Sequence, residues 1–172
     1  MTLLSRLLRP RRDDRAPVRP LWHRLVAIAR DKAWYLEGGV EDSVTGRFDM
    51  VTLVLALVLL RMEVSETLRA PAALLTELFI EDMDGQLRQS GVGDLVVGKR
   101  IGRLMSVLGG RLGALREALA QADDAALETA IARNVRLREG TGAAALAAML
   151  RAFAARLDSI NEAALLEGAI AR

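Results

Sequence analysis

The sequence predicts an all-α fold: a single-domain helical bundle of about six to seven helices. Of the 172 residues, 28 are Ala and 30 are Leu, both strong helix formers, whereas aromatic residues make up only 3% of the chain. Apolar residues recur every three to four positions, and no stretch of the sequence alternates with the period of two that strands require. Glycines and prolines separate the periodic stretches, as expected for turns between helices.

Two helices are predicted in the first third of the chain. Apolar residues recur at helical spacing over 20–36, and a loop over 38–46, which begins with two glycines, ends this helix. The eleven residues from Met50 to Leu60 are almost all apolar, which predicts a helix over 47–62 that is buried on all sides. This run is too short to cross a bilayer, because a spanning helix needs about 20 residues.

Two longer helices follow, over 71–89 and 95–120, and Asp94 is the expected N-cap of the second. The second helix contains several glycines, each of which costs about 1 kcal/mol relative to Ala in a helix. These glycines are Gly98, Gly102, Gly109, Gly110 and Gly113. Several glycines on one helix usually allow a neighbouring backbone to approach closely, so we expect another backbone to pass close to this helix.

The C-terminal part of the chain predicts three more helices. Asp123 is the expected cap of a helix that runs to Glu139, and a helix over 143–157 follows the break at residues 140–142. Ser159 and Glu162 have the spacing of a capping box, which predicts a last helix over 160–171.

Positive charge is concentrated at the N-terminus. Residues 1–24 hold seven arginines against two aspartates, whereas the rest of the chain carries slightly more acidic than basic side chains. We therefore predict a basic, disordered tail over 1–19 and a helical domain over 20–172, and we expect no nucleic-acid partner. The tail has four apolar residues at helical spacing: Leu3, Leu4, Leu7 and Leu8. The alternative role for the tail is peripheral contact with an anionic membrane.

The sequence offers few residues for catalysis. It has no cysteine and a single histidine, His23, which leaves no thiolate ligand and no set of residues for a Ser-His-Asp arrangement. Residues 93–99 match the skeleton G-x-x-x-x-G-K of a phosphate-binding loop, but Arg100 stands where Ser or Thr would bind magnesium, and no strand precedes it. We therefore expect no enzyme activity and no cofactor.

An acidic face leaves one alternative open. On a helix, Glu77, Glu81 and Asp84 share a face, where they could hold a hard cation if another helix supplied oxygen ligands. A solvent-exposed acidic face explains the same pattern. The alternative function is thus a small helical metal- or ligand-binding protein or enzyme that uses this face.

Three blocks of the sequence resemble the ubiquinol-cytochrome c chaperone family. Residues 39–50 read GVEDSVTGRFDM, residues 78–100 read LFIEDMDGQLRQSGVGDLVVGKR, and residues 132–135 read ARNV. The resemblance spans about residues 20–140 and is weak beyond them. It implies a helical, non-enzymatic assembly factor, because mitochondrial members of the family help to assemble the cytochrome bc1 complex by holding newly made cytochrome b.

From this resemblance we expect a chaperone at the cytoplasmic face of a bacterial inner membrane. Its client is cytochrome b or another bc1 subunit, a helper subunit is a further expected partner, and no cofactor is needed. The residues expected to contact a partner are Arg47, Phe48, Asp49, Asp82, Asp84, Gly91, Gly93, Asp94, Lys99 and Arg100.

A purely structural role for these residues is the alternative: the glycines and Asp94 shape a turn, and Arg47 pairs with Asp49. The sequence also departs from the family pattern in the central helix. The family leads us to expect a histidine and an aromatic residue near Val54 and Ala56, and a basic residue near Leu60.

Overall fold

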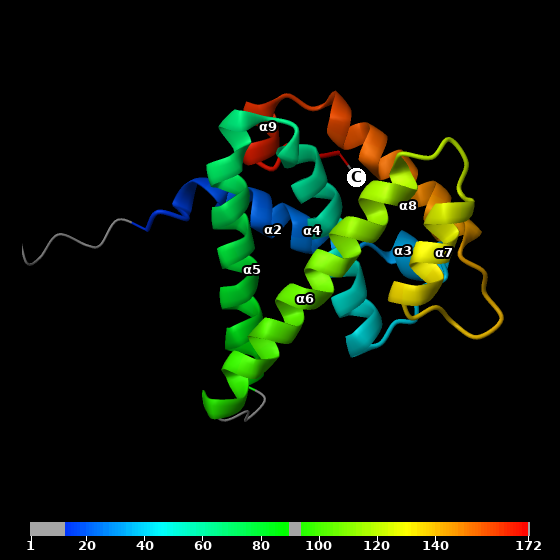
Figure 1. The fold of residues 1–172 in the computed structure, drawn as a ribbon, viewed down its shortest axis with the longest axis horizontal. Coiled ribbons are helices and arrows are strands. Elements are labelled where there is room, and N and C mark those ends of the chain that lie inside the picture. The colour runs from blue at the N-terminus through cyan, green and yellow to red at the C-terminus, as the bar shows by residue number, and fades with distance from the viewer. Residues whose placement is uncertain (1–12, 90–93, 172) are drawn as a thin grey trace, which may run out of the picture.

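The structure, a computed structural model, describes residues 13–89 and 94–171, and of residues 87–89, 94–97 and 100 it describes the backbone alone. The predicted all-α class is confirmed. Within the described residues, the only β pairing is an isolated bridge between Val40 and Leu137. Figure 1 shows helix α6 crossing over the central α4, with α5 on one side and α7 and α8 on the other.

The predicted helix over 20–36 is wrong in one respect, because it consists of two helices. Helix α2 spans Arg19–Ala29 and α3 spans Lys32–Leu36. The chain leaves the helix at residue 30, and the Asp31 carboxylate accepts a hydrogen bond of 3.0 Å from the Ala33 N–H and so caps α3. A short polar side chain that bonds nearby backbone N–H groups thus overrides the continuous apolar pattern.

The packed part of the chain begins before residue 20. Residues Ala16–Val18 form the 3-10 helix η1, and the Val18 side chain is fully buried. The predicted disordered tail over 1–19 is therefore too long at its C-terminal end, because an apolar side chain there joins the core. Residues 1–12, including the leucine stripe, lie outside the described residues.

Helix α4, Val44–Glu63, is the buried centre of the bundle, as its apolar run predicts. It begins three residues earlier than expected because Ser43 adopts an extended conformation and its hydroxyl accepts a hydrogen bond from the Gly46 N–H. Val54 and Ala56, where the sequence departs from the family pattern, are both fully buried in the core. Small apolar side chains at these positions allow the neighbouring helices to pack closely around α4.

Helices α5 and α6 form a long pair beside α4 (Figure 1). The 3-10 helix η2, Glu66–Leu68, leads into α5, Arg69–Gln89, and α6 spans Asp94–Leu119. The expected close partner of the α6 glycines is absent from the described part of the chain. A Cβ built at any of five glycines of α6 meets no described atom within 4 Å: Gly98, Gly102, Gly109, Gly110 and Gly113.

The C-terminal helices are α7, Ala125–Asn134, α8, Ala144–Ser159, and α9, Glu162–Leu166. Helix α7 ends before the predicted Glu139 because Val135 is extended and the next residues pair with the loop at Val40. The predicted Ser159 capping box is also wrong. The Asn161 side chain caps α9 by accepting a hydrogen bond from the Ala164 N–H, and Glu162 instead bonds to the hydroxyls of Ser65 and Thr67.

No helix in the described ranges is both long enough and apolar enough to span a membrane.

Candidate functional site

A groove of about 560 Å³ opens where the first turns of α4 meet the second half of α5. Helices α2 and α6 complete its walls. Its apolar lining consists of Val26, Val44, Phe48, Val51, Met83 and Leu104. Its charged rim consists of Arg30, Arg47 and Asp82. An apolar floor with a few charges of both signs at the edge is the usual composition of a binding site for an apolar segment.

The register of α4 decides which side chains reach the groove. Val44, Phe48 and Val51 follow one another at spacings of four and three, so they lie on one face of the helix. The next residues in sequence, Asp49 and Thr52, turn toward the core and are buried. The N-terminal half of α4 thus serves the groove on one side and the core on the other.

A buried ion pair lies directly behind the groove. The Arg111 guanidinium of α6 and the Asp49 carboxylate are each about 5% exposed, and Arg111 Nη2 lies 2.5 Å from Asp49 Oδ1. Arg111 also donates to the Asn134 carbonyl at 2.6 Å, and Asp49 Oδ2 accepts from the Arg136 N–H at 3.0 Å. The pair therefore joins α4 and α6 to the end of α7.

The same guanidinium supports the groove floor. Arg111 Cζ lies 5.8 Å from the centre of the Phe48 ring, within the range of a cation–π contact. Arg111 also donates to the Thr52 hydroxyl, while its Nε has no hydrogen-bond partner among the described residues. The orientation of Phe48 thus depends on a buried charge network.

Arg111 is not among the site residues that the sequence predicts. Two features of the sequence could have drawn attention to it. Arg111 interrupts the apolar stripe of its helix between Leu108 and Leu115, both of which are buried, and Asp49 likewise precedes the buried run of α4. Opposite charges at core positions of two helices predict a buried pair, but many pairings satisfy that rule.

Arg47 and Asp49 do not pair, so this part of the structural alternative is wrong. Arg47 is exposed and its Nε donates to the Asp42 carboxylate at 2.7 Å. This hydrogen bond holds the pKa of Asp42 below its ordinary value of 3.8. Arg47 and Asp49 lie two positions apart on α4 and point to opposite sides, one to the rim of the groove and one to the core.

The structure also separates the two aspartates of α5. Asp82 lines the groove, and its carboxylate lies 3.5 Å from the Gln86 amide nitrogen. Asp84 lines a shallow depression elsewhere on α5 together with Glu77, Glu81 and Arg15. The groove thus brings together Arg47, Phe48 and Asp82, and it leaves Asp84 outside.

The structure describes the remaining predicted site residues only in part. Gly91 and Gly93 lie outside the described residues, and of Asp94 and Arg100 only the backbone within α6 is described. Lys99 is exposed on the first turns of α6. The predicted partner surface around this turn therefore stays a prediction.

The acidic face of α5 has a basic neighbour. Arg15 Nη1 lies 2.9 Å from Glu81 Oε2. In the part of the chain that the structure describes, no group of three or more His, Asp or Glu side chains is placed to hold a metal ion. An ion pair with the N-terminal segment thus accounts for part of this acidic face.

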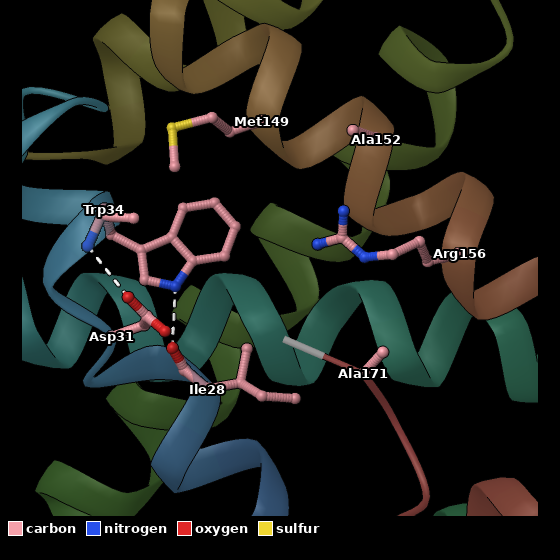
Figure 2. Close-up of a pocket in the computed structure, with 8 residues that line it drawn as sticks. Ile28, Asp31, Trp34, Met149, Ala152, Arg156 and Ala171 are labelled. Carbon is pink, nitrogen blue, oxygen red and sulfur yellow. Dashed lines mark hydrogen bonds between the residues drawn. The ribbon is translucent and has the colours of Figure 1, made fainter.

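A second cavity, of about 180 Å³, lies between α3 and α8 (Figure 2). Met149 and Arg156 of α8 approach the Trp34 indole from one side, and the indole N–H donates to the Ile28 carbonyl at 2.7 Å. The polar atom of the indole is thus satisfied internally. The small volume and the aromatic packing of Trp34 against Phe153 indicate a gap in the packing of the bundle.

Comparison with protein families decides what kind of protein carries this groove. The sequence model of the family described as "Ubiquinol-cytochrome C chaperone" matches residues 36–171. The chain belongs to the ubiquinol-cytochrome c chaperone family. The match reaches further toward the C-terminus than the expected region of 20–140, so helices α8 and α9 are part of the family fold.

A solved structure supports the same membership. The crystal structure of the Cbp3 homolog from Brucella abortus superimposes with a TM-score of 0.77 at 35% sequence identity. The alignment covers 90% of this chain and 87% of that chain. A search of curated proteins finds no match. The family match and the solved structure therefore both support the membership of this chain in the chaperone family.

Proposed function

We propose that this chain is a non-enzymatic assembly chaperone of the cytochrome bc1 complex, which holds newly made cytochrome b through the groove between α4 and α5. One observation carries the proposal. The two sequence blocks that most resemble the family, residues 39–50 and 78–100, lie far apart in the chain, and both supply side chains to this groove.

The chemistry of the groove suits a segment of a membrane protein. Cytochrome b is built of apolar helices, and before they are assembled in the bilayer their apolar side chains need a covered site. Phe48, Met83 and Leu104 provide an aromatic ring, a flexible thioether and a branched aliphatic side chain, which adapt to side chains of different shapes. The rim charges determine the orientation of the bound segment and contribute less to its affinity.

The remaining partners belong to the same proposal. A helper subunit shares the work of client binding, and the protein acts at the cytoplasmic face of a bacterial inner membrane, with the basic N-terminal tail as a peripheral contact. Family membership and the charge of residues 1–24 support these parts of the proposal.

Site-specific crosslinking tests the client. A photoreactive amino acid replaces Gln86, which is exposed at the groove, and in a control strain it replaces Thr129, which is exposed on α7. We expect cytochrome b to be crosslinked from position 86 and not from position 129, as identified by mass spectrometry of the membrane fraction. Crosslinks to cytochrome b from both positions, or from neither, would contradict the proposed site.

A further inference from the structure

The groove between α4 and α5 contains two charges that its own chain leaves without a counter-charge. Among the described residues that line it, the charged ones are Arg30 at the end of α2, Arg47 of α4 and Asp82 of α5. The Arg47 guanidinium pairs with Asp42 at 2.7 Å. The Arg30 side chain makes no ion pair with a described residue, and the Asp82 carboxylate meets only the Gln86 amide, at 3.5 Å. One cation and one carboxylate therefore remain for an occupant of the groove.

Two other carboxylates near the groove do not face it. Asp31 follows Arg30 in sequence, but its carboxylate accepts a hydrogen bond from the Ala33 N–H, and its side chain lines the cavity between α3 and α8. Glu37 lies at the far end of α3 and is not among the residues that line the groove. The unmatched charges of the groove are thus of both signs, so a partner with both an acidic and a basic side chain complements them.

The groove is also small compared with a membrane-spanning helix. Its volume of about 560 Å³ lies in the range of sites that hold one drug-sized molecule. A spanning helix has about 20 residues and is about 30 Å long. The groove therefore covers a few side chains of such a segment, roughly one or two helical turns, and leaves the rest of the segment outside.

The two parts of a spanning segment differ in charge. Acidic and basic side chains are rare in its middle, whereas Lys and Arg are frequent where the segment ends on the cytoplasmic side. An uncharged middle part would cover Arg30 and Asp82 with apolar side chains and leave both without a counter-charge, which costs free energy. An end of the segment supplies apolar side chains for Phe48 and Met83 together with charged side chains for the rim.

We propose that the groove binds a charged end of a membrane-spanning segment and not its apolar middle. One or two turns of apolar side chains contact Phe48 and Met83, while a Lys or Arg of the segment pairs with Asp82 and an Asp or Glu pairs with Arg30. This inference rests on the proposed function, because it names the part of the client that the groove holds.

Synthetic peptides test this preference on the full-length protein. Four fluorescently labelled peptides share a helical host of Leu and Ala and differ at two positions on opposite edges of the apolar face. These positions hold Gln and Gln, Lys and Gln, Gln and Glu, or Lys and Glu. Fluorescence anisotropy measures the dissociation constants. Each single charge should tighten binding up to about fivefold relative to the neutral peptide, and the peptide with both charges should bind at least about tenfold more tightly.

Neutral variants assign each preference to one side chain of the groove. Asp82→Asn should abolish the gain from Lys and keep the gain from Glu, and Arg30→Gln should do the reverse. The controls are Asp84→Asn, outside the groove on the same helix, and Arg133→Gln, at an exposed position on α7. Both controls should bind the four peptides as the wild type does. Circular dichroism shows that all four variants are folded.

Two results would overturn the proposal. Equal affinity for the four peptides, or tightest binding of the neutral one, would assign the groove to the apolar middle of a segment. Crosslinks from position 86 that map to the uncharged middle of a cytochrome b helix would do the same and would leave the proposed client intact. Conversely, if the charged peptides are preferred but cytochrome b is not crosslinked, the charge preference stands and the identity of the client is contradicted.

Discussion

At the scale of single residues, one buried charge pair positions the groove. Asp49 and Arg111 are buried together, and Arg111 also contacts the ring of Phe48. The removal of one member of a buried pair leaves the other charge without its partner in a medium of low dielectric constant. The stability of the bundle and the shape of the groove therefore depend on the same two side chains.

We expect Asp49→Ala to lower the free energy of unfolding by about 3 to 5 kcal/mol, since it leaves the Arg111 guanidinium buried and uncompensated. Asp42→Ala is the matched control. It removes the exposed partner of Arg47, and exposed ion pairs contribute little to stability. Urea denaturation followed by circular dichroism measures both variants. Equal unfolding midpoints for the two would show that the buried pair contributes no more than the exposed one.

A second prediction at this scale concerns Glu162. Hydrogen bonds from the hydroxyls of Ser65 and Thr67 lower its pKa below the ordinary value of 4.5. A carboxyl group whose pKa falls on folding stabilises the protein above its unfolded pKa, and this stabilisation is lost as the pH falls through the folded pKa. The free energy of unfolding of wild type should therefore exceed that of Glu162→Gln at pH 7, and the difference should shrink below pH 4.5. A difference that does not depend on pH would contradict this account.

At the scale of elements, the glycines of α6 lower the stability of the helix, and no close contact within the described residues requires them. Gly102 and Gly109 lie in the interior of the helix, and the space where a Cβ would stand is open at both. Glycine costs conformational entropy in a helix, and within the described residues no close backbone approach requires it at these positions.

Gly102→Ala and Gly109→Ala should each raise the free energy of unfolding by about 0.5 to 1 kcal/mol. Gly46→Ala is the contrasting variant on α4. A Cβ there would lie 1.9 Å from the Glu41 carbonyl oxygen, so the loop would have to move and stability should fall. Thermal denaturation of the three variants measures the sign of each change. Destabilisation by both α6 substitutions would show that these glycines have a structural role in the folded chain.

The elements show why some boundaries are predictable and others are not. Long apolar periodicity predicts α4, α5 and α6 to within a few residues, because burial of a continuous face dominates there. The break at Asp31 depends on one side-chain hydrogen bond, and so does the Asn161 cap that replaces Ser159. Such local competition leaves the hydrophobic pattern unchanged, so the pattern alone does not reveal it.

The candidate site is likewise predictable from the sequence only in part. Resemblance to the family identifies Arg47, Phe48 and Asp82, which the groove brings together. It does not identify Arg111, whose role depends on the crossing of α6 over α4. Helical periodicity places Asp82 and Asp84 on opposite sides of α5. It does not show which side faces the groove, because that depends on how α5 packs in the bundle.

At the scale of the whole molecule, the groove brings together side chains from four helices, α2, α4, α5 and α6. We propose that the client binds in this groove.

The most direct test compares two charge reversals on one helix, Asp82→Lys at the groove and Asp84→Lys outside it. Membranes of strains that carry either variant are assayed for assembled cytochrome b, and circular dichroism of the purified proteins shows that both are folded. We predict that Asp82→Lys lowers assembled cytochrome b severalfold, while Asp84→Lys leaves it near the wild-type level. A normal level with Asp82→Lys, or an equal loss with Asp84→Lys, would contradict the assignment of the groove as the client site.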